Sequence, residues 1–273
     1  MAARALPESK RHSAILAYHS IGGGSRFSEP AEQFEKQMNL LAASFTIVPL
    51  RTLLAALPAG GERLAAITFD DGFEDLYTCA FPILRKHGLP FTVFLPTGFL
   101  EGGSAFFRWS PHYAGLPPLT WEQVREMMTE GCSVGSHTHS HARLSDCTPD
   151  EVFEELTQSK RILERRTGTE ATALAYPFGQ PHDYDQRVIL AARAAGYDSG
   201  FTALQTCIRS IPNRYEIPRI TIDASDGTDD FVQKITGRRD FMAGVEAVNS
   251  ALVRTGLRRQ SVIAPRSTAR SCR

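Results

Sequence analysis

The sequence predicts an α/β fold in which parallel strands, each followed by a helix, close into one barrel-like domain. Two observations carry this prediction. Short apolar runs alternate along the chain with amphipathic stretches, which is the pattern of repeated strand–helix units around a mostly parallel sheet. About seven or eight such runs occur without an internal linker, and α/β barrels of 273 residues form a single domain. A doubly wound open sheet is the alternative arrangement of the same units.

The predicted strands are short apolar segments bounded by polar or turn-forming residues. They cover residues 13–18, 45–48, 64–69, 91–95, 132–135, 172–175, 197–201 and 217–222. The spacing of apolar residues predicts helices between them, over residues 31–43, 74–87, 120–130, 149–167 and 184–195.

The helix predicted over 149–167 has the clearest terminal signals. Thr148 and Glu151 can form a capping box, and Pro149 occupies the first helical position. Gly168 follows the last turn, where a left-handed residue ends many helices. Both boundaries of this helix are therefore predicted from the residues alone.

Composition and charge describe an ordinary soluble globule. Apolar residues make up 42% of the chain and charged residues 22%, and 30 basic residues balance 30 acidic ones. This balance argues against a nucleic-acid or anionic-membrane partner. The five scattered cysteines predict reduced thiols, and no secretory signal or transmembrane segment is visible. We therefore expect a cytoplasmic protein, and the oligomeric state is left open.

The two ends of the chain are expected to lie outside the main domain. Residues 1–13 are interpreted as an N-terminal extension, residues 14–240 as the domain, and residues 241–273 as a C-terminal helix with a basic, flexible tail. Six arginines and no acidic residue follow Glu246. A frayed, solvated tail is the favoured interpretation, and a functional basic arm is the alternative.

Polar motifs follow the predicted strands directly. They are the pair Tyr18-His19, the triplet Asp70-Asp71-Gly72, the histidine cluster at 137–141 and the segment Tyr176-Pro177-Phe178-Gly179. In a parallel barrel the carboxyl ends of all strands meet on one face, where active sites lie. We therefore expect these motifs to converge although more than 150 residues separate the first from the last.

Two aspartates and three histidines predict a metal-assisted hydrolase. Asp70 and Asp71 end a strand, and such a like-charged pair is costly unless a cation neutralises it. His137 and His141 can reach one ion, with His139 directed elsewhere. One carboxylate and two imidazoles complete a metal site with an open position, and the second carboxylate is free to move a proton. The alternatives are a plain Asp-Asp-Gly turn and polar histidines on a surface loop.

These motifs resemble those of a known family. Thr68-Phe69-Asp70-Asp71-Gly72 is similar to the first motif of the polysaccharide deacetylase family, whose shared region is the NodB homology domain (carbohydrate esterase family 4). The cluster at 137–141 is similar to its His-Ser/Thr-x-x-His motif, and the segment 176–179 to its third motif. The resemblance covers about residues 14–222 and implies an α/β fold, a distorted (β/α)7 TIM-like barrel in a single domain.

The resemblance also implies an activity, the metal-dependent removal of N-acetyl groups from N-acetylglucosamine units of a polysaccharide or oligosaccharide. Carried over residue by residue, it implies that Asp71, His137 and His141 bind one divalent ion and that Asp70 is the general base. Zinc is the default ion, and Co²⁺, Ni²⁺ or Fe²⁺ can occupy the same ligands. It places substrate binding, including an oxyanion-stabilising backbone N–H near Phe178, at Tyr176, Pro177, Phe178 and Arg219.

The chain departs from the family pattern at three places. Ala175 stands where the third motif usually has an arginine that braces the base, and the tryptophan of the fourth motif is missing. The final Leu-x-His motif is also missing, because no histidine follows His182. Some members that deacetylate biofilm exopolysaccharides use an N-terminal Tyr-His motif instead. We therefore hypothesise that His19 is the general acid and that Arg219 replaces the missing arginine.

Two other functions remain open at this point. The same scaffold could hydrolyse a non-sugar amide or imide, since a fold does not determine its substrate. The chain could also be a carbohydrate-binding protein whose catalysis has lapsed with the lost motifs. Retention of Asp70 beside a complete metal triad argues against a carbohydrate-binding protein without catalysis, because such a protein needs no general base.

Overall fold

The computed structural model describes residues 12–22, 28–57 and 63–254. Its strands are β1 (Ala14–Tyr18), β2 (Ser20–Ile21), β3 (Ser28–Glu29), β4 (Thr46–Ile47), β5 (Leu64–Phe69), β6 (Phe91–Leu95), β7 (Cys132–Ser136), β8 (Ala173–Ala175), β9 (Ser199–Phe201) and β10 (Ile220–Thr221). Its α-helices are α1 (Ala31–Ser44), α2 (Leu50–Ala56), α3 (Phe81–Lys86), α4 (Thr97–Leu100), α5 (Ala105–Trp109), α6 (Trp121–Thr129), α7 (Pro149–Thr167), α8 (Gln186–Ala194), α9 (Thr228–Ile235) and α10 (Phe241–Arg254).

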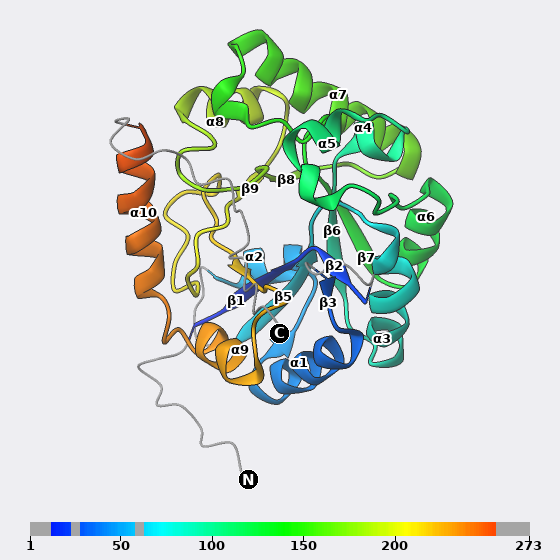
Figure 1. Cartoon of the computed structure of the whole chain (residues 1–273), viewed down its shortest axis with the longest axis vertical. Coiled ribbons are helices and arrows are strands. Elements are labelled where there is room, and N and C mark those ends of the chain that lie inside the picture. The colour runs from blue at the N-terminus through cyan, green and yellow to red at the C-terminus, as the bar shows by residue number, and fades with distance from the viewer. Residues whose placement is uncertain (1–11, 23–27, 58–62, 255–273) are drawn as a thin grey trace, which may run out of the picture.

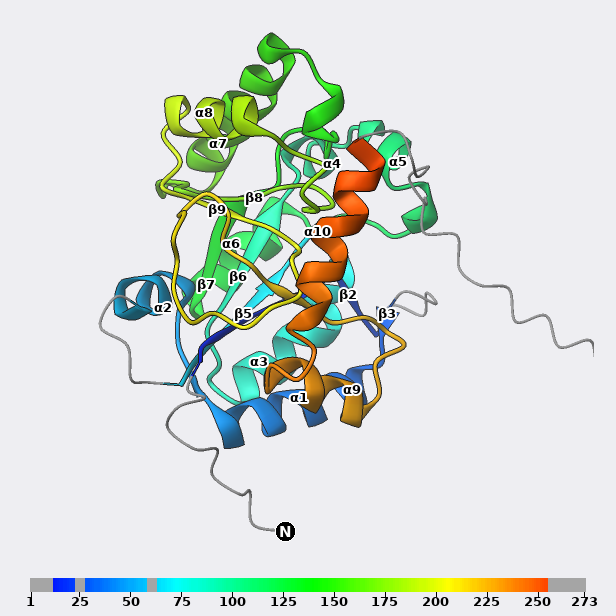
Figure 2. The same ribbon diagram turned by 90° about the vertical axis from the view of Figure 1, so that its left-hand side faces the viewer.

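The sheet is parallel and curls into a distorted (β/α)7 barrel, as expected. Its strand order is β10-β1-β5-β6-β7-β8-β9, with β4 attached to the side of β5. A parallel bridge between Phe201 and Ile217 joins β9 to the segment that leads into β10, so the two edges of the sheet meet. Helices α1, α3, α6, α7 and α8 lie around the outside of the strands, and α10 runs along one flank (Figure 1, Figure 2).

Side chains alternate along the strands between two apolar layers. Leu16 of β1 and Ile67 of β5 belong to the large core between the sheet and the outer helices. Ile15 packs instead with residues from other strands around the sheet, among them Phe94 and Phe201. This second cluster contains residues of β1, β5, β6, β8 and β9 and fills the interior of the barrel. Any polar side chain at the carboxyl ends of these strands therefore lies above a closed apolar floor.

The helix α7 confirms the predicted terminal signals. The Thr148 side chain accepts from the Glu151 backbone N–H, the Glu151 side chain accepts from the Thr148 backbone N–H, and Pro149 is the first helical residue. Gly168 ends the helix with a left-handed φ of 71°. The predicted boundaries and the observed ones coincide because these signals act within one turn of the chain.

Other elements differ from the prediction. The strand expected to be buried over 45–48 is only β4, whose two residues are exposed or half-buried at the side of the sheet. The helix expected over 74–87 begins as a π-helical turn at Leu76–Ala80 and continues as α3. The short helices α2, α4 and α5, and α9 as well, were not predicted.

The expected terminal segments lie partly outside the described residues. This is true of the predicted extension up to residue 11 and of the basic tail beyond residue 254, whereas α10 occupies the start of the predicted C-terminal segment. No helix in the described ranges combines the length and the apolar character that a bilayer span requires.

Candidate active site

The barrel brings the predicted motifs together at the carboxyl ends of its strands. Asp70 and Asp71 follow β5, His137 and His141 follow β7, and His19 follows β1. The Asp70 backbone N–H donates to the Tyr18 carbonyl at 2.8 Å, which ties the aspartate pair to the end of β1. The convergence predicted from sequence is thus a consequence of the parallel pairing of neighbouring strands.

Asp71, His137 and His141 form a candidate metal site. One ligand atom from each residue lies within 4.8 Å of the others, and all three side chains are buried. Asp71 Oδ1 lies 3.2 Å from His141 Nε2 and 3.6 Å from His137 Nε2. His137 Nδ1 donates to the Ala175 carbonyl at 2.8 Å, so its Nε2 carries the lone pair that faces Asp71.

The protonation states of His137 and Asp71 are compatible with a bound cation between their side chains. Burial lowers the pKa of His137 to about 4, so this imidazole is neutral at neutral pH. Burial alone would raise the pKa of Asp71, but the neighbouring His141 keeps that pKa well below its ordinary value. Asp71 Oδ1 is buried and has no hydrogen-bond donor among the described residues. A buried anionic oxygen that faces a nitrogen lone pair is unfavourable unless a cation lies between them, so the triad fits a divalent ion.

The backbone around this triad is strained. The non-glycine residues with a left-handed φ in the described ranges are Asp71 (69°), Thr138 (66°), His141 (61°) and Phe178 (62°). Each such residue costs about 1–2 kcal/mol relative to ordinary backbone. Strain of this kind persists only where the surrounding structure compensates it, and it concentrates at functional sites.

Hydrogen bonds hold the histidine loop in this conformation. Thr138 Oγ1 accepts from the His141 backbone N–H at 3.1 Å. Glu155, on α7, accepts from the backbone N–H groups of His139 and Ser140 at 2.9 and 2.8 Å. The His139 ring is directed elsewhere, as expected, because its Nδ1 pairs with Thr97 Oγ1 at 3.0 Å.

The second aspartate, Asp70, is paired with Arg219. Arg219 Nη1 and Nη2 donate to the two carboxylate oxygens of Asp70, each at 2.7 Å, and the two side chains are only 1% and 4% exposed. Burial raises the pKa of Asp70, but the Arg219 charge outweighs it and holds that pKa below its ordinary value. Asp70 is therefore a buried, ionised carboxylate in a fixed orientation beside the triad.

The sequence of this chain matches a known family over half its length. The sequence model of the polysaccharide deacetylase family covers residues 58–200. YxkH of Bacillus subtilis, whose name places it in the same family, is 31% identical over 212 residues, which are 76% of this chain and 70% of YxkH. This chain belongs to the polysaccharide deacetylase family. It is accordingly an enzyme of the deacetylase class.

Other similar proteins agree with this assignment. The poly-β-1,6-N-acetyl-D-glucosamine N-deacetylase of Staphylococcus aureus is 26% identical over 208 residues, which are 72% of this chain and 68% of that protein. The structure of the Streptococcus pyogenes deacetylase PplD in complex with acetate superposes with a TM-score of 0.70 and 25% identity, over 82% of this chain and 98% of PplD. IcaB from Ammonifex degensii shares the fold, with a TM-score of 0.69 and 23% identity over 87% of this chain and 97% of IcaB.

Two family departures have a visible structural counterpart. Ala175, at the position of the usual arginine, packs in the cluster inside the barrel. Arg219 follows Asp70 by 149 residues in the sequence. Its guanidinium lies 5.2 Å from the centre of the Phe94 ring. Its Nε donates to the Thr202 carbonyl. Arg219 therefore contacts Asp70, as the hypothesis that it replaces the missing arginine requires, and it is buried, whereas the resemblance also grouped it with substrate-binding residues.

Within the segment 176–179, one residue faces the candidate site and another is buried in the core. The Phe178 ring lies 5.1 Å from the His141 ring, and no acceptor for the Phe178 backbone N–H is found within the described ranges. Pro177 connects Phe178 to Tyr176. The Tyr176 side chain is 1% exposed, and its hydroxyl donates to the Tyr215 carbonyl. Phe178 is therefore the member of this segment that faces the candidate metal site.

His19 lies beside the aspartates and is partly exposed. Its ring stacks on Tyr113 with a centroid distance of 6.4 Å and an interplanar angle of 22°. The Asp70 backbone N–H donates to the carbonyl of Tyr18, the residue before His19, so His19 and the aspartate pair lie at neighbouring strand ends.

The segment between β6 and α6 contributes residues that the sequence interpretation did not assign. Ser110 Oγ pairs with His141 Nδ1 at 3.3 Å, and the Phe106 ring lies 5.0 Å from the His141 ring. The Tyr113 ring contacts both His19 and Phe73. A lone serine in a loop carries no sequence signal, because only the folded chain brings it to the Nδ1 atom of His141, a residue of the candidate metal site.

Proposed function

We propose that this enzyme removes N-acetyl groups from N-acetylglucosamine units of a polysaccharide and uses a divalent ion held by Asp71, His137 and His141. The observation that carries the proposal is the ionised, Arg219-bound carboxylate of Asp70 beside that triad. The name of the Staphylococcus aureus relative supports β-1,6-linked poly-N-acetylglucosamine as the first substrate to examine.

The chemistry follows from the position of each group. A divalent ion bound at the triad supplies Lewis acidity, which polarises an amide carbonyl and acidifies a water. Asp70 accepts a proton from the water as it attacks the acetyl carbon, and Arg219 keeps Asp70 ionised and oriented for that step. The Phe178 backbone N–H donates to the oxygen that becomes negative. The C–N bond then breaks, the nitrogen takes a proton from His19, and acetate and the free amino sugar leave.

The test of this function is the release of acetate. Metal-stripped protein, with zinc or cobalt restored, is incubated with N-acetylglucosamine oligomers and polymers of different linkages, beside the isosteric variant Asp70→Asn. We expect metal-dependent acetate that falls by at least 10²–10⁴-fold in Asp70→Asn, because the base is lost. Asp198→Asn serves as the control, since Asp198 is an exposed acid before β9, at the opposite end of the barrel.

Two outcomes of this assay contradict the proposal. Acetate from non-sugar amides alone would point to the same chemistry on another substrate. Absence of acetate from all glycans, with one ion bound per chain, would favour a carbohydrate-binding protein without catalysis.

The proposed role of His19 has a separate test. We expect His19→Ala to lower kcat for N-acetylated glycans by about 10²-fold or more, because an amine leaves poorly without a proton. Hydrolysis of 4-nitrophenyl acetate should fall far less, because nitrophenolate leaves unprotonated. His87→Ala, which removes a histidine paired with Glu35 at the end of α3, should leave both rates unchanged. Equal losses on both substrates would assign His19 to structure, and unchanged glycan turnover would exclude it as the acid.

A further inference from the structure

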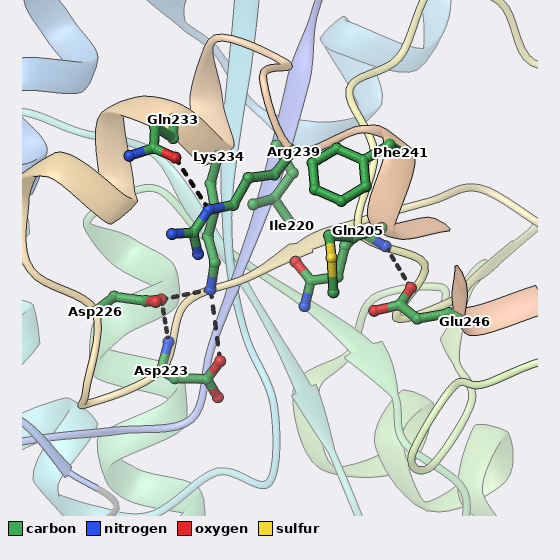
Figure 3. A pocket seen from close by; sticks show the side chains of 10 residues that line it. Gln205, Ile220, Asp223, Asp226, Gln233, Lys234, Arg239, Phe241 and Glu246 are labelled. Carbon is green, nitrogen blue, oxygen red and sulfur yellow. Dashed lines mark hydrogen bonds and ion pairs between the residues drawn. The ribbon is translucent and has the colours of Figure 1, made fainter. Parts of the chain in front are cut away.

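A cleft of about 580 Å³ lies between β10, α9 and the start of α10 (Figure 3). Its walls include Gln205, Asp223, Lys234, Phe241 and Glu246. Such a volume is within the range of about 300–1,000 Å³ that small-molecule sites occupy. None of these residues belongs to the catalytic group described above.

The cleft borders the candidate active site on two sides. Strand β10 pairs with β1, with Thr221 opposite Ala17, so Asp223 after β10 and His19 after β1 follow neighbouring strand ends. On the other side, the loop that carries Gln205 is bonded to the segment of Phe178, because the Ala203 backbone N–H donates to the Gly179 carbonyl at 2.9 Å. A glycan chain that occupies the active site can therefore extend into this cleft.

The basic side chains of the cleft are already paired. Lys234 is only 9% exposed and binds Asp226 and the Thr221 carbonyl. Arg239 is bound to Asp230 and to Gln233. These two cations are therefore poorly available to an anionic ligand.

The acidic side chains keep free acceptor capacity. Glu246 Oε2 accepts from the Gln205 backbone N–H at 3.1 Å, and no partner for Oε1 is found among the described residues. Asp223 is 63% exposed, and its side chain meets Lys234 only at 3.5 Å. The available charge in the cleft is thus negative, which favours a cationic ligand.

Two further groups suit a sugar. Phe241, the first residue of α10, is 67% exposed and presents an aromatic surface at the cleft (Figure 3). Gln205 also lines the cleft, and its Oε1 is buried and has no donor among the described residues, so a hydrogen bond from a ligand would replace no existing bond once the side chain turns toward the cleft. An aromatic surface, a carboxylate and an amide oxygen together recognise a ring that carries hydroxyls and an ammonium group.

We propose that this cleft binds a glucosamine unit, through its free ammonium group, in the same glycan chain whose N-acetyl group occupies the active site. The proposal rests on the proposed function, since each turnover produces such a unit. A chain that is already partly deacetylated is then held more tightly than a fully acetylated one, and the enzyme works preferentially beside its earlier products.

Binding of a β-1,6-linked glucosamine pentamer tests the cleft by calorimetry. The pentamer carries no acetyl group, so the unmodified enzyme binds it without turnover. We expect Glu246→Gln and Phe241→Ala each to raise Kd about fivefold, and Glu246→Gln to reduce the weakening of binding by added salt. Glu154→Gln and Phe153→Ala are matched controls, because these two residues are exposed on α7, and they should leave Kd unchanged. Release of acetate from the N-acetylglucosamine disaccharide should be the same in all four variants.

The two readouts separate the two proposals. Wild-type Kd values in both cleft variants, or no binding of the pentamer to the unmodified enzyme, would overturn the glucosamine site whatever the acetate assay shows. Absence of acetate from all glycans would overturn the proposed function, and the pentamer titration would still decide the glucosamine site.

Discussion

Replacement of Arg219 by methionine is expected to destabilise the enzyme by about 3–5 kcal/mol and to lower its activity at least 10²-fold. Methionine fills much of the same space but leaves the Asp70 carboxylate buried without its partner. An unpaired buried charge costs far more than the ion pair contributes. The activity falls for a related reason, because Arg219 keeps Asp70 ionised and holds both of its oxygens in place.

Denaturant unfolding of a double-mutant set measures the first effect. The variant Asp70→Asn/Arg219→Met should be more stable than Arg219→Met alone, because the buried negative charge is gone. Arg209→Met is the matched control, since Arg209 is 56% exposed and its pair with Asp240 is expected to contribute about 1 kcal/mol or less. A free energy of unfolding for Arg219→Met within about 1 kcal/mol of the wild type would show that the pair is not important for stability.

Replacement of His137 by alanine is expected to abolish both metal binding and acetate release. Asp71 and His141 then offer only two ligands, and the Nε2 atom 3.6 Å from Asp71 Oδ1 is removed. His139→Ala is the matched control within the same loop, because the His139 ring is held by Thr97 and not by the triad. Equilibrium dialysis against zinc, followed by elemental analysis, should find about one ion per chain in the wild type and His139→Ala but none in His137→Ala.

The hydrogen bond between Ser110 and His141 predicts a smaller loss of zinc affinity, measured by the same equilibrium dialysis. Ser110→Ala keeps all three ligands but removes the hydroxyl that pairs with His141 Nδ1. Loss of such a contact lowers metal affinity by about 10–100-fold. For the His137→Ala variant of the preceding experiment, one bound zinc ion per chain with unchanged affinity would contradict the assignment and place the metal site elsewhere.

The order of strands and helices was predictable because it depends on local periodicity. A strand alternates and a helix repeats every 3.6 residues, so both leave a pattern in the sequence. The boundaries of α7 were predictable for the same reason, since Thr148, Glu151 and Gly168 act within a few residues of the helix ends. The short β4 and the π-helical turn before α3 were not, because packing decides them and not periodicity.

In the candidate site, too, some features follow from local sequence and others depend on the folded chain. The sequence by itself determined that Asp71, His137 and His141 stand at the ends of parallel strands, and parallel pairing then brings them together. The family resemblance also led us to hypothesise that Arg219 braces Asp70, but the two-fold hydrogen bond between them is seen only in the tertiary structure. Only the tertiary structure decided that Ser110 supports His141 and that a cleft with acidic groups lies near the candidate site. These contacts join residues with no common local pattern. They depend on how β10 closes the barrel and on where the loops above it come to rest.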